Sequence, residues 1–92
     1  LCLAVSVACP TGSLADVEAG RRAANRGEFR KAYDEWRPLA DAGNAEAQYN
    51  LGRLYANGDG VPRSYSEAFR WFERAGMLGH KKAQQALAKM YK

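Results

Sequence analysis

The amino-acid sequence predicts an all-α protein, an α/α solenoid of stacked antiparallel helix pairs. Three observations support this prediction: an internal repeat with a constant spacing, apolar residues at helical intervals within each repeat, and glycines where the helical patterns stop. The chain has 92 residues, of which 47% are hydrophobic and 26% charged. This length and composition suit one globular domain at most.

An internal repeat runs through most of the chain. Residues 47–56, AQYNLGRLYA, align with residues 83–92, AQQALAKMYK, at an offset of 36. The same offset superimposes like residues upstream: Phe29 on Tyr65, Ala32 on Ala68, Tyr33 on Phe69, Trp36 on Phe72 and Gly43 on Gly79. Such self-similarity is typical of repeat architectures. We therefore divide the chain into a divergent unit at about 16–43, a complete unit at 44–79 and a partial unit at 80–92.

Each unit is expected to contain two helices. The first unit gives helices over 16–25 and 28–42 with a turn at Gly27, and Pro38 should kink or loosen the second helix because it removes a backbone donor. In the middle unit, Asn44 is a suitable N-cap for a helix over 45–56. Ser64 begins the next helix, with Glu67 at capping-box spacing. The last helix covers 81–92.

The segment 57–62, NGDGVP, is predicted to be a structural loop. Gly58 and Gly60 supply positive φ, Val61 packs into the helix pair, and Pro62 stiffens the entry to the next helix. A calcium loop would need a bidentate Glu downstream, and a phosphate-binding loop would need Gly-Lys-Ser/Thr opening a helix. Neither pattern is present, so we expect no metal or cofactor here.

Gly52 lies inside a predicted helix, where glycine costs about 1 kcal/mol relative to alanine. The position is small in every unit: Gly20, Gly52 and Ala88. A small residue lets the partner helix approach and leaves room for a large side chain, for which Trp36, Trp71 and Phe72 are the candidates.

Taken together, these features resemble the Sel1-like repeat, a relative of the tetratricopeptide repeat. The residues that carry the resemblance are Ala47, Leu51-Gly52, Tyr55, Gly58-x-Gly60-Val61, Ala68, Trp71-Phe72, Ala75 and Gly79. The resemblance implies a right-handed superhelix whose first helices line a concave surface, and a non-catalytic role as a scaffold or adaptor for protein partners. Small bacterial members of this type are commonly exported.

Residues 1–15 are predicted to be the remnant of an export signal. Residues 1–9, LCLAVSVAC, form an uncharged apolar run too short to span a bilayer, and Ser13-Leu14-Ala15 suits cleavage after Ala15. The mature protein would be periplasmic or secreted and would have no membrane segment. Lipidation at Cys9 is an alternative, although Ser6 replaces the large aliphatic residue expected three positions earlier.

Catalysis has little support in the predicted mature chain, which has one histidine, His80, no cysteine, and two serines, Ser64 and Ser66. His80 aligns with Asn44, a helix-start position, so its expected role is capping or simple exposure. A small envelope hydrolase or a β-lactam-binding protein remains an alternative, but the cysteines that mark such relatives are absent. A basic nucleic-acid-binding module is a second alternative, permitted by the net charge of +4, although the acidic residues are interleaved with the basic ones.

A candidate partner site follows from the repeat. The residue after each small position is cationic, Arg21, Arg53 and Lys89, and stacking would align these charges along the groove. Lys82 and Lys92 would extend the column, and Tyr49 would offer an aromatic platform. We therefore expect an acidic segment of another protein to bind there. Arg63 and Arg70 are expected on the side of the second helices.

Overall fold

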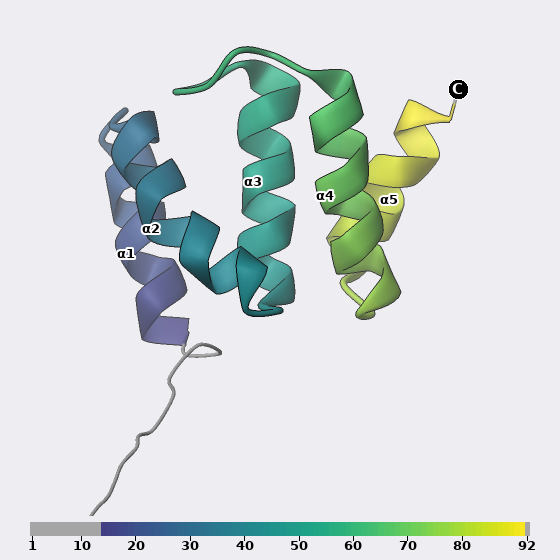
Figure 1. Cartoon of the computed structure of the whole chain (residues 1–92), viewed down its shortest axis with the longest axis horizontal. Coiled ribbons are helices and arrows are strands. Elements are labelled where there is room, and N and C mark those ends of the chain that lie inside the picture. The colour runs from purple at the N-terminus through teal and green to yellow at the C-terminus, as the bar shows by residue number, and fades with distance from the viewer. Residues whose placement is uncertain (1–13, 92) are drawn as a thin grey trace, which may run out of the picture.

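The described part of the chain, residues 14–91, forms five α-helices in the computed structural model (Figure 1). They are α1 (Leu14–Asn25), α2 (Phe29–Asp41), α3 (Ala45–Asn57), α4 (Tyr65–Met77) and α5 (Lys81–Met90). These bounds confirm the predicted helices to within a few residues. The predicted export segment lies outside the described residues, apart from Leu14 and Ala15 in the first turn of α1.

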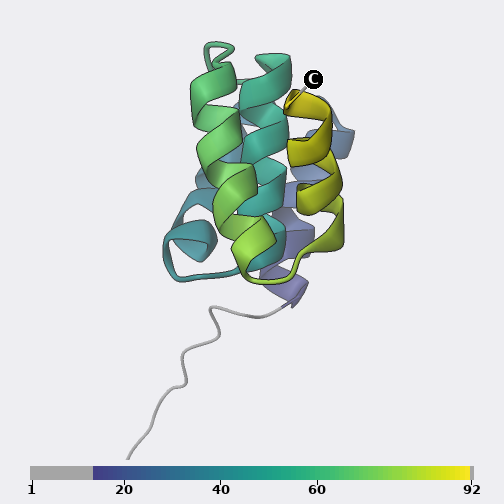
Figure 2. The same cartoon turned by 90° about the vertical axis from the view of Figure 1, so that its right-hand side faces the viewer.

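The main packing contacts join helices that follow one another in the chain, from α1 with α2 through to α4 with α5. The helices therefore stack in chain order as an α solenoid (Figure 1). In Figure 2, α4 and α5 lie on either side of the view with α3 behind them, and the C-terminal part of α2 lies on the α4 side. The second helices thus share one side of the array.

Side-chain caps begin α3, α4 and α5. Asn44 Oδ1 accepts from the Ala47 amide at 3.0 Å, and Ser64 Oγ accepts from the Glu67 amide at 3.2 Å. His80 Nδ1 accepts from the Ala83 amide at 3.2 Å. Each cap satisfies one of the backbone donors that a helix leaves unpaired at its start. The predicted cap at Asn44 is confirmed, and of the two roles expected for His80 the structure shows capping.

The loop between α3 and α4 adopts the predicted backbone. Gly58 ends α3 in a left-handed conformation with φ of 73°, and Gly60 has φ of 74°. A Cβ on Gly60 would lie 2.7 Å from the carbonyl carbon of Phe29, so the loop packs closely on the start of α2. Val61 is buried, as expected.

α2 continues as one helix through Pro38, which the sequence predicted to disturb it. Figure 1 shows the last turns of α2 turning toward the start of α3. Pro38 is exposed, so the backbone carbonyl that loses its intrahelical partner there is close to solvent. The helix can therefore tolerate this proline.

The small positions receive aromatic side chains from the second helices, as predicted. A Cβ on Gly20 would lie 2.6 Å from Trp36 Cδ1, and one on Gly52 would lie 2.6 Å from Phe72 Cε1. Trp36 and Phe72 are therefore the residues that fill this space, and Trp71 is not. Ala88, the third small residue, is exposed, because no helix in the described part of the chain packs on that side of it.

The repeat also preserves a polar contact between units. Gln48 Nε2 donates to the Ala40 carbonyl at 3.0 Å, and Gln84 Nε2 donates to the Gly76 carbonyl at 2.9 Å. Both bonds join a first helix to the end of the preceding second helix. They fix the way one unit stacks on the next.

Candidate functional site

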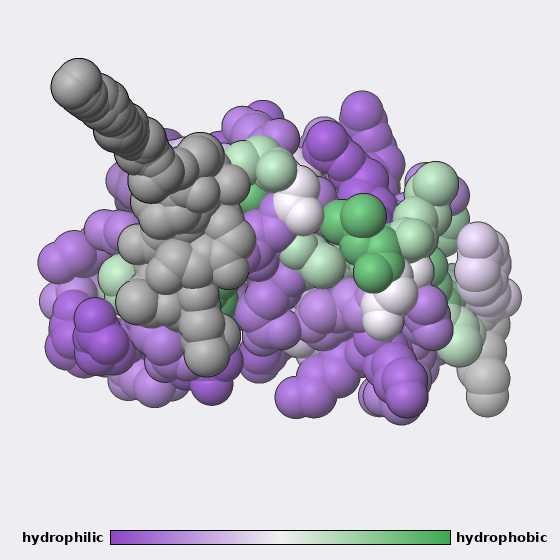
Figure 3. Space-filling model, turned by 90° about the horizontal axis from the view of Figure 1, so that it is seen from below, coloured by the Kyte–Doolittle hydropathy of each residue, from purple (hydrophilic) through white to green (hydrophobic). Residues whose placement is uncertain are grey.

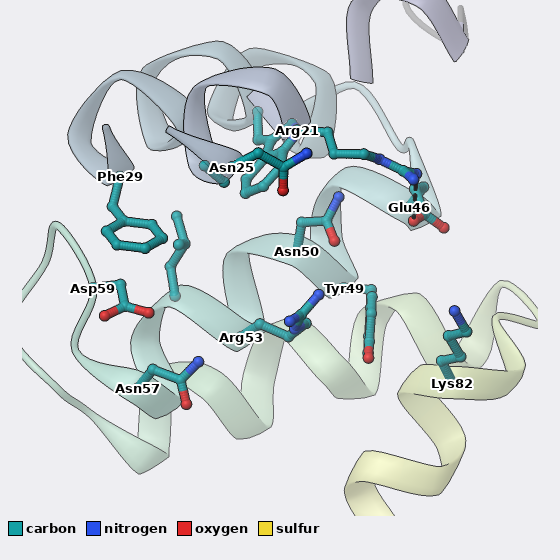
Figure 4. A pocket seen from close by; sticks show the side chains of 13 residues that line it. Arg21, Asn25, Phe29, Glu46, Tyr49, Asn50, Arg53, Asn57, Asp59 and Lys82 are labelled. Carbon is teal, nitrogen blue, oxygen red and sulfur yellow. Dashed lines mark ion pairs between the residues drawn. The ribbon is translucent and has the colours of Figure 1, made fainter. Parts of the chain in front are cut away.

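A hollow of about 340 Å³ opens beside α3 and contains most of the predicted partner-binding residues. Its lining comes mainly from α1 and α3, with contributions from α2, the loop after α3 and the first turn of α5. We call it the Tyr49 hollow; Arg21, Ala24, Asn25, Phe29, Trp36, Glu46, Tyr49, Asn50, Arg53, Leu54, Asn57, Asp59 and Lys82 line it (Figure 4).

Four of the six predicted site residues meet here: Arg21, Tyr49, Arg53 and Lys82. Lys89 does not line the hollow, because only the first turn of α5 reaches this space and Lys89 lies in the last turn. The predicted column of Arg21, Arg53 and Lys89 therefore does not form a single lining. Lys92 lies outside the described residues.

Tyr49 is held in place by aromatic neighbours. The His80 ring stacks on it with centroids 4.7 Å apart, and the Phe72 ring packs against it at 5.7 Å. The Arg53 guanidinium carbon lies 5.8 Å from the centre of the Tyr49 ring. These contacts hold Tyr49 as a half-buried platform beside a cation, as an aromatic recognition surface requires.

Glu46 is an acidic member of the hollow that the sequence analysis missed. Its carboxylate accepts from His80 Nε2 at 2.7 Å and lies 3.9 Å from an Arg21 nitrogen. Arg21 also pairs with Glu18 at 3.4 Å. Part of the Arg21 charge is thus neutralised, whereas Arg53 and Lys82 form no ion pair with any described residue.

Asn50 is the second residue that the sequence analysis missed. The residue as a whole is 6% exposed, and its side-chain amide makes no hydrogen bond within residues 17–91; the fully buried side-chain atom without a partner in that range is instead Gln48 Oε1. Figure 4 shows Asn50 on α3, pointing into the hollow near Asn25 and Arg53. The Asn50 amide thus opens into the hollow with its donors and acceptor unused by described residues, and it suits a ligand that presents both an acceptor and a donor.

Acidic side chains are few in the hollow, and one of them, Glu46, is bonded to the neighbouring His80. Within the described range, no three His, Cys, Asp or Glu side chains lie close enough to hold a metal ion. His80 uses one ring nitrogen for the α5 cap and the other for Glu46, and therefore has no nitrogen left for a substrate.

Residues 45–80, which include α3 and α4, match the Sel1 repeat family. The chain carries a Sel1 repeat. A curated relative, the F-box protein At1g70590 of Arabidopsis thaliana, is 36% identical over 76 residues, which cover 83% of this chain. The chain spans 21% of the length of that relative. No helix in residues 14–91 is both long and apolar enough to span a membrane.

The Sel1 repeat makes the role of His80 testable, because Asn44 caps α3 at the equivalent position. His80→Ala should destabilise the protein by about 1 kcal/mol or more, since it removes the cap and the bond to Glu46. His80→Asn should restore the cap but not the bond to Glu46, and should recover part of the loss in urea unfolding. Equal stability of the two variants would show that the cap contributes nothing.

Proposed function

We propose that this chain is a non-catalytic adaptor that binds an extended, acidic segment of another protein in the Tyr49 hollow. Sel1 repeats generally mediate protein–protein interactions, and the family is typically non-catalytic. The observation that carries the proposal for this hollow is the Asn50 amide, which opens into it without a partner among the described residues, beside two cations that form no ion pair in that range. We further propose, from the apolar N-terminal run, that the protein acts after export.

The Asn50 amide suits the backbone of a peptide. A peptide bond presents one N–H donor and one C=O acceptor, and an asparagine side chain presents the complementary pair. An extended segment exposes these backbone groups because they are not used in a helix. Asn50 would therefore fix the partner's main chain, without selecting its side chains.

Arg53 and Lys82 would supply the preference for acidic side chains. Arginine can bind a carboxylate with two parallel hydrogen bonds, and Tyr49 already holds the Arg53 guanidinium near its ring. The hollow also contains the acids Glu46 and Asp59. The attraction is consequently local to Arg53 and Lys82, which differs from a uniformly basic surface suited to nucleic acid.

Charge reversal tests this proposal. Fluorescently labelled peptides rich in Asp and Glu would be titrated with the protein, and anisotropy would give their Kd. Arg53→Glu should weaken binding by about tenfold or more, whereas Arg63→Glu, which makes the same charge change outside the hollow, should have a much smaller effect. The affinity should also fall as salt is added.

Two further arms complete the experiment. Asn50→Ala should weaken the binding of acidic and neutral extended peptides alike, since the Asn50 amide is proposed to hydrogen-bond to the peptide backbone. A random DNA duplex should compete poorly. Equal losses in Arg53→Glu and Arg63→Glu, or an affinity independent of salt, would contradict a site in the hollow.

A further inference from the structure

A second hollow lies on the other side of α3, between α2 and α4. It measures about 580 Å³ and is lined by Arg37, Tyr55, Glu67, Arg70, Trp71 and Arg74. We call it the Trp71 hollow. It shares no lining residue with the Tyr49 hollow, so its ligand is independent of the function proposed above.

Three guanidinium groups gather around this space. The Arg37 and Arg74 carbons lie 5.3 Å and 4.7 Å from the centre of the Trp71 ring. Trp71 is almost fully buried, so it forms a floor beneath these two cations. Like charges that line one concave surface focus a positive potential there, which raises the local concentration of anions.

The arginines differ in how their charge is balanced. Arg37 Nε lies 3.2 Å from both carboxylate oxygens of Asp41. Arg70 and Glu67 approach only to 3.8 Å. Arg74 forms no ion pair with any residue in the described range, so its guanidinium donors are available.

A tyrosine pair orients a further donor. Arg37 Nη1 donates to the Tyr33 hydroxyl oxygen at 2.8 Å, and the Tyr33 and Tyr55 oxygens are 3.2 Å apart. Either hydroxyl can be the donor in the bond between the two tyrosines. An anion in the hollow would favour the arrangement in which Tyr33 donates to Tyr55 and the Tyr55 O–H, which lines the hollow, donates to the anion.

The Tyr55 proton is firmly held. Burial, with the hydrogen bond to Tyr33 as the next cause, raises the pKa of Tyr55 to about 12. The hydroxyl is therefore a neutral donor at physiological pH, beside three permanent cations.

We propose that the Trp71 hollow binds an oxyanion of the phosphate class, either free phosphate or a phosphorylated side chain. Arg74, Arg70 and Arg37 supply charged N–H donors, and Tyr55 supplies a hydroxyl donor. A phosphate dianion has enough oxygens to accept from several of these groups at once, and a single carboxylate has only two. Glu67 competes with the anion for Arg70 and so limits its affinity.

Calorimetric titration at constant ionic strength tests this site. The probes are inorganic phosphate, a phosphoserine peptide, its unphosphorylated counterpart, and acetate, all at pH 8, where phosphate is mainly a dianion. Phosphate and the phosphoserine peptide should bind saturably, while acetate and the unphosphorylated peptide should not. Tighter binding of the phosphopeptide identifies a phosphorylated side chain as the ligand, and tighter binding of inorganic phosphate identifies the free ion.

Single substitutions assign the donors. Arg74→Gln and Tyr55→Phe should each weaken phosphate binding by about tenfold, as expected for a hydrogen bond to a charged group. Arg63→Gln removes an exposed cation outside the hollow and should change little. Glu67→Gln should strengthen binding, because it releases Arg70. Circular dichroism would confirm that each variant is folded.

The result that overturns the proposal is equally specific. It is overturned if phosphate fails to bind saturably, if acetate binds as well as phosphate, or if Arg63→Gln loses as much affinity as Arg74→Gln. Weaker phosphate binding by Glu67→Gln would also contradict the proposed site, since the proposal requires Glu67 to compete with the anion for Arg70.

Discussion

Replacing Gly20 or Gly52 with alanine is expected to destabilise the protein, although alanine is the better helix former by about 1 kcal/mol. The new Cβ would lie within 2.6 Å of the buried ring of Trp36 or Phe72, and neither ring has room to move away. Overpacking of this kind costs about 1–3 kcal/mol. Gly20→Ala should be the more damaging, because displacing Trp36 also breaks its 3.0 Å hydrogen bond to the Val17 carbonyl.

Gly76 provides the matched control. It also lies inside a helix, but its Cβ would meet no aromatic ring: the nearest atoms are Gln84 Cγ at 3.3 Å and Leu87 Cδ1 at 3.5 Å. Gly76→Ala should therefore cost much less stability than either of the other two substitutions, because a shift of a few tenths of an ångström relieves the contact. Urea unfolding of the three variants measures the difference, and a loss of similar size at all three glycines would show that the aromatic contacts are not its cause.

Deletion of residues 81–92 is the second change with a large expected effect. α5 contributes Ala83 to a buried cluster with Ala68, Phe72 and Ala75 of α4, and Tyr91 packs edge-on against Phe69 with ring centroids 5.7 Å apart. Removing this helix would expose Phe72, which is now 4% exposed. We expect a loss of about 2–5 kcal/mol, as for the loss of a large buried contact. For a domain of this size that loss lowers Tm by about 10 °C or more.

Thermal unfolding followed by circular dichroism would measure this change. Lys89→Ala is a suitable control, because Lys89 lies on an exposed position of the same helix. The control should melt like the unmodified protein. A truncated chain with an unchanged Tm would mean that α5 does not stabilise the array.

The helices were predictable because their signals are local. Asn44, Ser64 and His80 mark helix starts, and Gly58 marks a helix end, through chemistry that involves only the nearest residues. The repeat then explained why Gly20 and Gly52 are glycines. A position that is small in every unit indicates a large side chain packed against it from the partner helix. Sequence alone left Trp71 and Phe72 as rival partners for Gly52, and the structure identifies Phe72.

The composition of the two hollows was less predictable. Glu46 meets Arg21 and His80 only because α1, α3 and α5 stack, and no spacing along one helix indicates that meeting. Lys89 fails to join Arg21 and Arg53 because α5 reaches the Tyr49 hollow with its first turn alone. Asn50 could have been suspected as a polar residue next to the buried Leu51. The periodic pattern itself did not distinguish a buried amide from an exposed one.

The surface beneath the array differs from both hollows. Figure 3 shows this face as largely hydrophilic, with hydrophobic side chains gathered toward the C-terminal helices. Met77 and Leu78, at the turn between α4 and α5, are 81% and 58% exposed. A few exposed apolar residues are normal on a protein surface, so these two do not by themselves indicate a partner-binding surface.

The chain-order packing of the five helices has a consequence for how the protein folds. Each helix finds its main partner a short distance along the chain, so little loop-closure entropy is lost before a native contact forms. Arrays of this kind fold rapidly and can nucleate at more than one place. α3 packs against helices on both sides, whereas α1 and α5 each have one main neighbour. Amide protons in the middle of the array should therefore exchange most slowly, and opening should begin at the two ends.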